Sequence, residues 1–221
     1  MSAAPATSKE TEPRNVCAGP FGAVYDYYIE RPRLARVVLG LMWGVDPRPF
    51  YESLADVGEL EDGATILDVP CGGGVALRGL RPDQRACWIG VDSEPAMLRR
   101  AQKRAAGFPR IDAEFSEGDM TALTIEDQSV DLCLSYGGLH CIPNPEKALS
   151  EMARCLRPGG RLLGSTFLAD GSRRQRTLLR MDDFGVTGSA DELREWMLGC
   201  GFAEVRIDRE DGLAVFSALR P

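Results

Sequence analysis

The feature that most constrains this chain is an apolar run that ends in an acid and then breaks into three consecutive glycines. Residues 64–69 form a short apolar strand that contains Asp68, residues 72–74 are all glycine, and a helical pattern resumes over 73–80. This order predicts a strand, a tight turn without Cβ atoms, and the start of a helix. A ligand can then lie against bare backbone near the free N–H groups of a helix N-terminus. Open α/β sheets hold nucleotide-like ligands in this way.

The spacing of the glycines bears on which ligand the turn holds. Gly72 and Gly74 supply the first two glycines of a dinucleotide fingerprint, but Leu77 stands where the third is required. The carboxylate of Asp68 would repel phosphate groups and attract a cation. S-adenosylmethionine carries an ammonium and a sulfonium and no phosphate, so these residues favour it over a dinucleotide.

Length and composition restrict the class of protein. A chain of 221 residues with 27% charged and 44% apolar residues is one ordinary globular domain. The net charge of −7 argues against a nucleic-acid partner. Seven cysteines without a Cys-x-x-Cys pair indicate neither a disulfide framework nor a metal site, and they suit the reducing cytoplasm. No apolar stretch predicts stable membrane insertion, and the first residues lack the pattern of a signal peptide. The sequence leaves open whether the protein forms a homodimer.

The chain divides into a flexible tail (1–15), an aromatic-rich segment (16–57) and the remainder (58–221). Prolines cut the second part into predicted helices at 20–30, 32–43 and 48–57, which we interpret as an N-terminal helical cap. Its aromatic residues either line a closed apolar pocket or form the core of the cap itself; they include Phe21, Tyr25, Tyr28, Trp43 and Tyr51.

Strands and helices alternate through the remainder. We expect strands at 64–69, 87–91, 111–117, 130–136, 161–168, 202–209 and 213–219, with helices at 94–106, 145–156 and 191–198. This alternation predicts an α/β fold with a doubly wound, mostly parallel, seven-stranded sheet. The turn at 210–212 predicts a terminal hairpin, and hence one antiparallel strand at the sheet edge. Polar residues follow the strand ends, where an open parallel sheet binds its ligand: Asp68, Asp92, Asp119 and the pair Ser135 and Tyr136.

Five sequence blocks in this order resemble the class I S-adenosylmethionine-dependent methyltransferases, in the small-molecule branch that includes the quinone methyltransferases. They are Leu-Asp-Val-Pro-Cys-Gly-Gly-Gly, Gly-Val-Asp-Ser-Glu-Pro-Ala-Met-Leu, Gly-Asp-Met, Val-Asp-Leu-Cys-Leu-Ser-Tyr-Gly-Gly-Leu-His and Leu-Arg-Pro-Gly-Gly-Arg-Leu, and they span about 66–167. The resemblance implies a Rossmann-like methyltransferase fold and S-adenosyl-L-methionine as cofactor.

The resemblance also implies roles for single residues. Asp68 and the turn at 72–74 would hold the methionyl end of the cofactor, Asp92 the ribose hydroxyls, and Asp119 the adenine amino group, beside the backbone of Met120. Pro70 replaces the first glycine of the usual turn, which gives a stiffer exit from the strand. The full predicted cofactor-binding set is Asp68, Pro70, Cys71, Gly72, Gly74, Asp92, Ser93, Met97, Asp119, Met120 and Ser135.

Each of the three acids has a simpler alternative. Asp68 and Asp92 both precede a predicted helix and would also serve as plain helix caps. Asp119 lies in a Gly-Asp-Met sequence that is common in turns.

The candidates for catalysis are Tyr136, which ends the fourth strand, and His140, which follows it. His140, the single histidine, would act as a general base towards a hydroxyl or as a hydrogen-bonding residue of the loop. Tyr136 would line the pocket or pack in the sheet. Further along, Arg173, Arg176 and Arg180 share one face if 173–180 is helical, and they would either clamp an anionic substrate or form a solvated basic face.

The sequence therefore predicts an enzyme that methylates a small, mostly apolar molecule, with oxygen of a hydroxyl or carboxylate as the expected acceptor. Methylation of a quinone-type ring carbon is the first alternative. A nicotinamide-dependent oxidoreductase and a catalytically silent cofactor-binding subunit are the rival classes.

Overall fold

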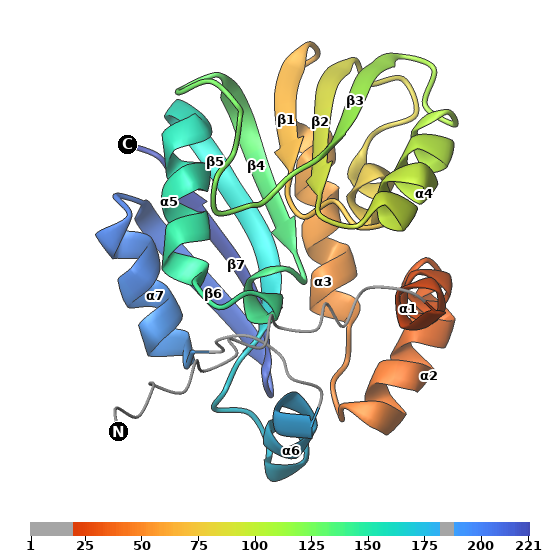
Figure 1. The fold of residues 1–221 in the computed structure, drawn as a ribbon, viewed down its shortest axis with the longest axis vertical. Coiled ribbons are helices and arrows are strands. Elements are labelled where there is room, and N and C mark those ends of the chain that lie inside the picture. The colour runs from red at the N-terminus through yellow and green to blue at the C-terminus, as the bar shows by residue number, and fades with distance from the viewer. Residues whose placement is uncertain (1–19, 182–187) are drawn as a thin grey trace, which may run out of the picture.

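The computed structural model describes residues 20–181 and 188–221 and shows one seven-stranded sheet with helices on both faces (Figure 1). The strand order is β3-β2-β1-β4-β5-β7-β6. The strands are β1 (Ala64–Asp68), β2 (Ala86–Asp92), β3 (Ile111–Glu117), β4 (Val130–Tyr136), β5 (Leu156–Phe167), β6 (Ala203–Glu210) and β7 (Leu213–Leu219). The predicted doubly wound, mostly parallel α/β fold is confirmed.

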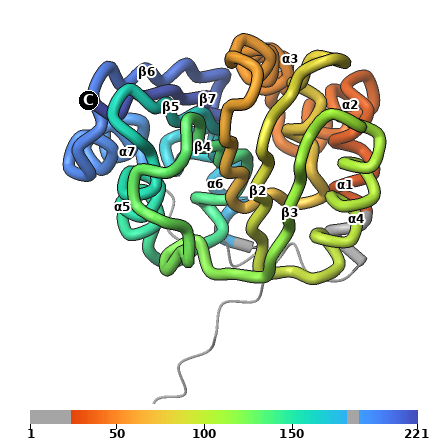
Figure 2. The backbone as a smooth tube through the Cα atoms, turned by 90° about the horizontal axis from the view of Figure 1, so that it is seen from above, coloured from red at the N-terminus to blue at the C-terminus, as the bar shows by residue number. Residues whose placement is uncertain are grey.

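Helices form two layers around this sheet. Along the chain they are α1 (Pro20–Ile29), α2 (Pro32–Met42), α3 (Arg48–Ser53), α4 (Pro95–Ala105), α5 (Pro145–Cys155), α6 (Arg173–Met181) and α7 (Ala190–Gly199), with short 3₁₀ turns η1 (Leu54–Glu59), η2 (Val75–Gly79) and η3 (Leu139–Cys141). Figure 2 shows α5 and α7 on one side of the strands and α1 to α4 on the other. The helices α1, α2 and α6 lie beyond the carboxyl ends of the parallel strands (Figure 1).

Local sequence explains where the helices begin. Pro95 and Pro145 occupy first-turn positions, where the missing N–H costs nothing. The side chain of Asn144 caps α5 by accepting the N–H of Lys147 at 3.0 Å. Helix α7 begins with a capping box in which Ser189 and Glu192 satisfy each other's backbone N–H groups.

The core lies on both faces of the central strands. Six of the seven residues of β4 are buried, as expected of a strand covered on both sides. One cluster packs Leu149 and Met152 of α5 against the sheet, and the other packs Phe50 of α3 and Val57 of η1 around Trp88. The N-terminal segment therefore shares a hydrophobic core with the sheet.

Three local expectations are corrected by the structure. After the glycines only the 3₁₀ turn η2 forms, and it ends before Leu80, whose backbone is extended. Strand β5 begins at Leu156, before the expected start, because Leu156 pairs with Val130 and a register shift absorbs 157–160. The antiparallel strand β7 lies between β5 and β6, so the edge strand is β6.

Candidate functional site

A cavity of about 1060 Å³ opens at the carboxyl ends of the parallel strands, where α1 and α2 cover them. Binding pockets for small molecules usually measure about 300–1,000 Å³, so this space suits a cofactor and an acceptor side by side. One part is bounded by the glycine loop and the ends of β2 and β3, and the other by aromatic side chains of the N-terminal helices. We call these the loop part and the aromatic part.

The glycine loop presents bare backbone to the cavity. Gly72 and Gly74 adopt φ values of +50° and +81°, which L side chains rarely adopt. A Cβ at Gly72 would meet nothing within 4 Å, so a ligand can approach this backbone closely. A Cβ at Gly73 would instead collide with the carboxylate of Asp26 from α1. The loop is therefore open towards the cavity and closed towards α1.

Asp92 at the end of β2 lines the cavity and ties the loop to the sheet. Its Oδ2 accepts the N–H of Gly72 at 2.8 Å, and its Oδ1 accepts the N–H of Glu94 at 2.9 Å. Burial raises the pKa of this carboxyl, although these two hydrogen bonds oppose the shift. Each carboxylate oxygen has a second lone pair, so Asp92 still has acceptor capacity for the hydroxyls of a ribose.

Asp68 lies behind the loop instead of on the cavity wall. It is fully buried, and its Oδ2 has no hydrogen-bond partner among the described residues. Burial raises the pKa of Asp68 well above its ordinary value, and the nearby Asp92 raises it further. A positive charge close by stabilises the ionised form of two adjacent buried carboxyl groups. The ammonium of S-adenosylmethionine would supply such a charge.

The charged residues on the cavity wall are all acidic. They are Asp92, Glu117 and Asp119, and neither Lys nor Arg is among the described residues that line this space. A pyrophosphate would meet only carboxylates here, whereas a cationic ligand without phosphate is complementary to them. The site therefore fits the cofactor that the sequence favours.

The remaining predicted residues of the loop part lie in two groups. Pro70, Ser93, Met97 and Met120 line the cavity. Asp119 also lines it, but its exposed carboxylate accepts the N–H and the hydroxyl of Thr121 at 2.8 and 2.9 Å, so part of its acceptor capacity is used within its own turn.

A second group of predicted residues lies behind the wall. Cys71, Gly74 and Ser135 do not line the cavity, although all three come from the same strand ends. The N–H of Cys71 donates to Val91 at 2.9 Å and so joins the loop to β2. Ser135 is fully buried in β4, and its Oγ has no partner within the described residues.

The aromatic part contains most of the aromatic residues of the N-terminal segment. Tyr25, Tyr28 and Trp43 line it, and Trp43 stacks on Phe167 with ring centroids 4.6 Å apart. Tyr51 instead donates to the carbonyl of Ile29 at 2.6 Å and belongs to the packing of the cap itself. The side chain of Phe21 lies outside the described residues. Some aromatic residues of this segment therefore line the pocket, while Tyr51 packs within the cap, so each of the two expectations holds for part of the segment.

Tyr136 connects the sheet to the N-terminal segment. Its hydroxyl lies 3.2 Å from Ser53 Oγ, and its ring packs edge-on against Phe50. Burial raises the pKa of the Tyr136 phenol. The ring borders the cavity, while the hydroxyl is engaged by α3.

His140 lies in η3 on the cavity wall and is almost fully buried. Its Nδ1 accepts the N–H of Phe167 at 3.4 Å and lies 3.2 Å from Thr166 Oγ1. Burial lowers the pKa of His140 to about 4, so the imidazole is neutral at pH 7. Because a backbone N–H can only donate, Nδ1 is the acceptor and Nε2 carries the proton of the neutral ring.

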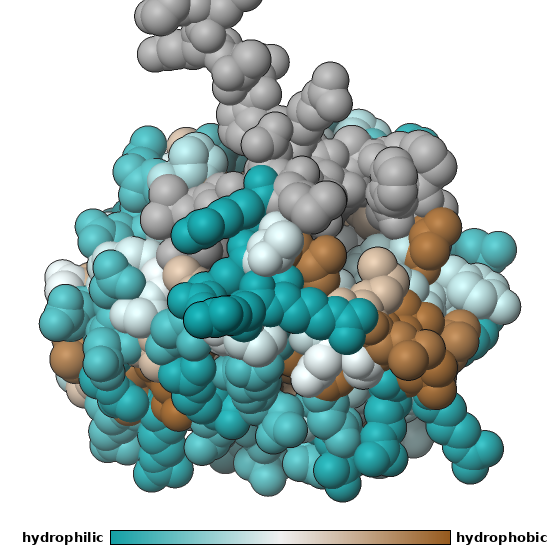
Figure 3. Space-filling view, turned by 90° about the horizontal axis from the view of Figure 1, so that it is seen from below, coloured by the Kyte–Doolittle hydropathy of each residue, from teal (hydrophilic) through white to brown (hydrophobic). Residues whose placement is uncertain are grey.

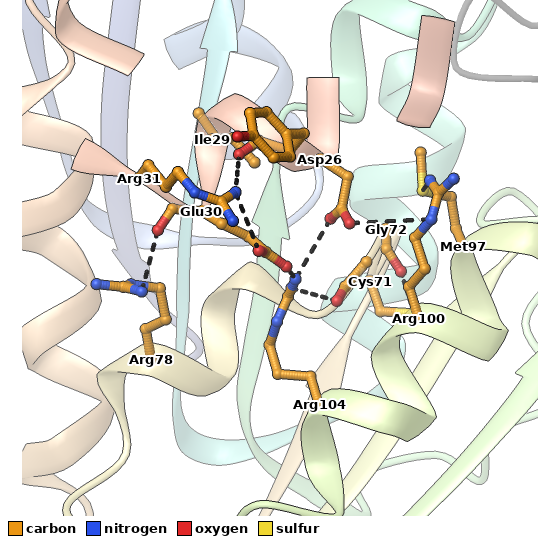
Figure 4. A network of polar contacts seen from close by, with 12 residues as sticks. Asp26, Ile29, Glu30, Arg31, Cys71, Gly72, Arg78, Met97, Arg100 and Arg104 are labelled. Carbon is orange, nitrogen blue, oxygen red and sulfur yellow. Dashed lines mark hydrogen bonds and ion pairs between the residues drawn. The ribbon is translucent and has the colours of Figure 1, made fainter. Parts of the chain in front are cut away.

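A network of charges joins α1 to the glycine loop (Figure 4). Arg104 of α4 donates to the carbonyl of Gly73 and pairs with Glu30 and with Asp26, the latter at 3.6 Å. Arg100 lies 4.0 Å from the other oxygen of Asp26. Sequence reasoning missed these residues because nothing in the sequence around 26 or 104 signals that the two segments meet. Asp26 is an acid within an aromatic-rich segment, but this position alone does not indicate a partner in α4.

The arginines predicted as a clamp lie elsewhere. Arg173, Arg176 and Arg180 are exposed on α6 and do not line the cavity. The described residues contain no group of three or more His, Cys, Asp or Glu side chains arranged to hold a metal ion. The helices of the described segments fall short of what a membrane crossing requires in length and apolar character.

Known proteins that are similar to this chain include methyltransferases. The family model described as a methyltransferase domain matches residues 66–160. An uncharacterized chloroplastic methyltransferase of Arabidopsis thaliana is 27% identical over 81% of this chain and 55% of its own length. The phthiotriol/phenolphthiotriol dimycocerosates methyltransferase of Mycobacterium leprae is 38% identical over 45% of this chain and 36% of its own length.

The fold also has counterparts of known structure. Phosphoethanolamine N-methyltransferase 2 of Haemonchus contortus, in complex with S-adenosyl-L-methionine, superposes with a TM-score of 0.68 at 16% identity. The superposition covers 77% of this chain and 52% of that one. The chain spans only about a third to a half of the length of the curated relatives that it matches first.

Proposed function

We propose that the chain is a class I S-adenosylmethionine-dependent methyltransferase, and that it transfers the methyl group of S-adenosylmethionine to a small, mostly apolar acceptor, at oxygen. The observation that carries the cofactor assignment is the loop part of the cavity. Bare backbone at Gly72 faces a wall whose charges are all negative. That combination suits a cationic nucleoside without phosphate groups.

The described residues would hold the cofactor along its length. Asp92 has acceptor capacity for the ribose hydroxyls, and the turn at Gly72 and Gly73 offers backbone to the methionyl end, with Asp68 behind it. Asp119 and Met120 line the same cavity, and they would contact the adenine. Ser93 and Met97 border the same region.

The aromatic part suggests the character of the acceptor. Its walls come from Tyr25, Tyr28, Trp43, Phe50 and Phe167, so an apolar molecule would bury its surface there favourably. Because no described lining residue is cationic, a neutral hydroxyl suits the site better than a carboxylate. Methylation at a quinone-type ring carbon is the alternative, since flat rings also stack well on Trp43 and Phe167.

The bound cofactor supplies the methyl electrophile, so the chain has mainly to align the acceptor and exclude water. The N-terminal helices cover the cavity and would exclude water from it. His140 borders the acceptor side and is the candidate for handling a proton there, either as a base or, in the tautomer described above, as an N–H donor at Nε2.

Calorimetric titration separates the proposal from an oxidoreductase. Purified protein should bind S-adenosylhomocysteine and should not bind NADH. Binding of NADH alone would overturn the proposal, because the acidic wall would then be accepting a pyrophosphate.

A second experiment separates an enzyme from a silent subunit and identifies the acceptor. The protein is incubated with methyl-labelled cofactor and fractionated cell extract, and labelled products are sought by mass spectrometry. A labelled apolar product is expected in the organic-soluble fraction. Cofactor binding without any labelled product, across all fractions, would favour the silent subunit.

A further inference from the structure

Two helices meet beside the cavity at the lower end of the molecule. Arg174 of α6 donates a hydrogen bond to the backbone carbonyl of Leu41 in the last turn of α2. Both helices lie beyond the carboxyl ends of the parallel strands (Figure 1). We call the outer surface of α2 and α6 the α2–α6 face.

Apolar side chains on this face are strongly exposed. Val37, Leu41 and Met42 of α2 are 57%, 70% and 51% exposed. Val24 and Tyr27 of α1 are also more than half exposed, and they line the cavity together with Met42. The apolar surface is therefore continuous with the cavity rim, and Figure 3 shows a brown apolar patch at this end of the molecule beside strongly hydrophilic side chains.

The α2–α6 face is also basic. Arg33, Arg173, Arg176 and Arg180 are exposed, and none of the four pairs with a carboxylate of the described residues. Two acids, Asp182 and Asp183, follow α6 in the sequence and lie outside the described residues. Segment 173–183 thus carries four arginines against two aspartates, in a chain whose net charge is −7. The basic charge is concentrated at the rim of the apolar patch.

We propose that the α2–α6 face docks on an anionic lipid bilayer, and that the apolar acceptor enters the cavity from that bilayer. Exposed apolar side chains flanked by arginines are the pattern of an interfacial helix, which buries its apolar side chains in the headgroup region without crossing the membrane. The entry of the acceptor from the bilayer rests on the proposed function, whereas the docking itself does not.

Charge distinguishes this occupant from a second copy of the chain. In a two-fold dimer the same patch would face itself, and the arginines of α6 would approach those of the partner. An anionic bilayer instead complements them.

The test is sedimentation of the full chain with vesicles of phosphatidylcholine alone or mixed with phosphatidylglycerol. Binding is expected only to the anionic vesicles and should fall as added salt shortens the screening length. Leu41→Glu should weaken binding at least about tenfold, because it replaces inserted apolar surface by a charge. Arg176→Gln and Arg180→Gln should each weaken it about fivefold.

Matched controls come from exposed residues elsewhere. Leu198→Glu changes a leucine of α7 that is 52% exposed, and Arg99→Gln changes an exposed arginine of α4; both should bind vesicles as the parent does. Every variant should keep its melting temperature and its affinity for S-adenosylhomocysteine, so that a failure of docking is separate from a failure of the proposed function. Equal loss in Leu198→Glu, or no preference for anionic vesicles, would overturn the proposal. So would a dimer in solution that Leu41→Glu dissociates.

Discussion

Asp92 and Gly72 are joined by a hydrogen bond of 2.8 Å, so that the end of β2 holds the loop that leaves β1. The two residues are far apart in sequence and meet because their strands are parallel neighbours. The carboxylate that we propose as the acceptor of the ribose hydroxyls therefore also fixes the backbone against which the methionyl end would lie. On this proposal, loop shape and cofactor affinity are coupled through this one side chain.

Replacement of that side chain tests the coupling. Asp92→Ala should weaken binding of S-adenosylhomocysteine by about 1–3 kcal/mol, because it removes charge-assisted hydrogen bonds to the ligand and the acceptor of the Gly72 N–H. Calorimetric titration measures the change. Asp112→Ala, on the same sheet but exposed in β3, is the control and should bind normally. Unchanged affinity in Asp92→Ala would remove this residue from the site.

The contact of the loop with α1 has its own test. Gly73→Ala should lower the free energy of unfolding by about 1–3 kcal/mol, because the new methyl group collides with Asp26. Gly199→Ala, where the added methyl group meets nothing within 4 Å, should leave stability equal or slightly higher. In an Asp26→Ala background the cost of Gly73→Ala should shrink. Chemical denaturation of the four variants measures these differences, and an equal cost in both backgrounds would contradict the described contact.

Arg104 should hold α1 in place over the cavity. Arg104→Gln leaves the buried Asp26 and the partly buried Glu30 without their shared cation, at a cost of about 1–3 kcal/mol. Backbone amides of α1 should then exchange with deuterium faster, and S-adenosylhomocysteine should dissociate faster, since α1 lines the cavity. Arg99→Gln on the exposed face of the same helix is the control. Identical exchange in both variants would show that the network does not restrain α1.

Much of this arrangement follows from local sequence. The strands are marked by short apolar runs and the turns by glycine, so β1 to β4 end within a residue of the predicted positions. The acids at the strand ends could be placed together because parallel strands share one carboxyl edge. Asp92 and Asp119 accordingly reach the same cavity.

Long-range contacts could not be predicted in this way. The position of β7 inside the sheet depends on how a hairpin docks, which its turn does not encode. The pairing of Asp26 with Arg104 depends on where α1 packs. Sequence also does not distinguish the positions of two acids that end neighbouring strands. Asp92 lines the cavity, whereas Asp68, at the corresponding end of β1, is buried behind its wall.

The low pKa of His140 predicts a pH dependence of stability. In the unfolded chain a histidine takes up its proton near pH 6.5, whereas in the fold His140 does so near pH 4. Between these values the unfolded state binds the extra proton, so the stability associated with neutral His140 is complete above pH 6.5. It is lost as pH falls to 4, by on the order of 3 kcal/mol. The difference in unfolding free energy between the parent and His140→Asn should shrink accordingly. Asp68 and Asp92, whose raised pKa values act in the opposite direction, cancel in that difference.

The same variant tests the part that His140 plays in catalysis. Because Nδ1 accepts the N–H of Phe167 and the pKa is low, we expect His140→Asn to lower kcat at pH 7 by less than about tenfold, as for a lost hydrogen-bond donor. A general base would show a loss of about 10²- to 10⁴-fold. Single-turnover rates with the identified acceptor distinguish the two, since they exclude product release. A loss in the larger range, with unchanged cofactor affinity, would mean that the imidazole turns to accept the proton of the acceptor during the reaction.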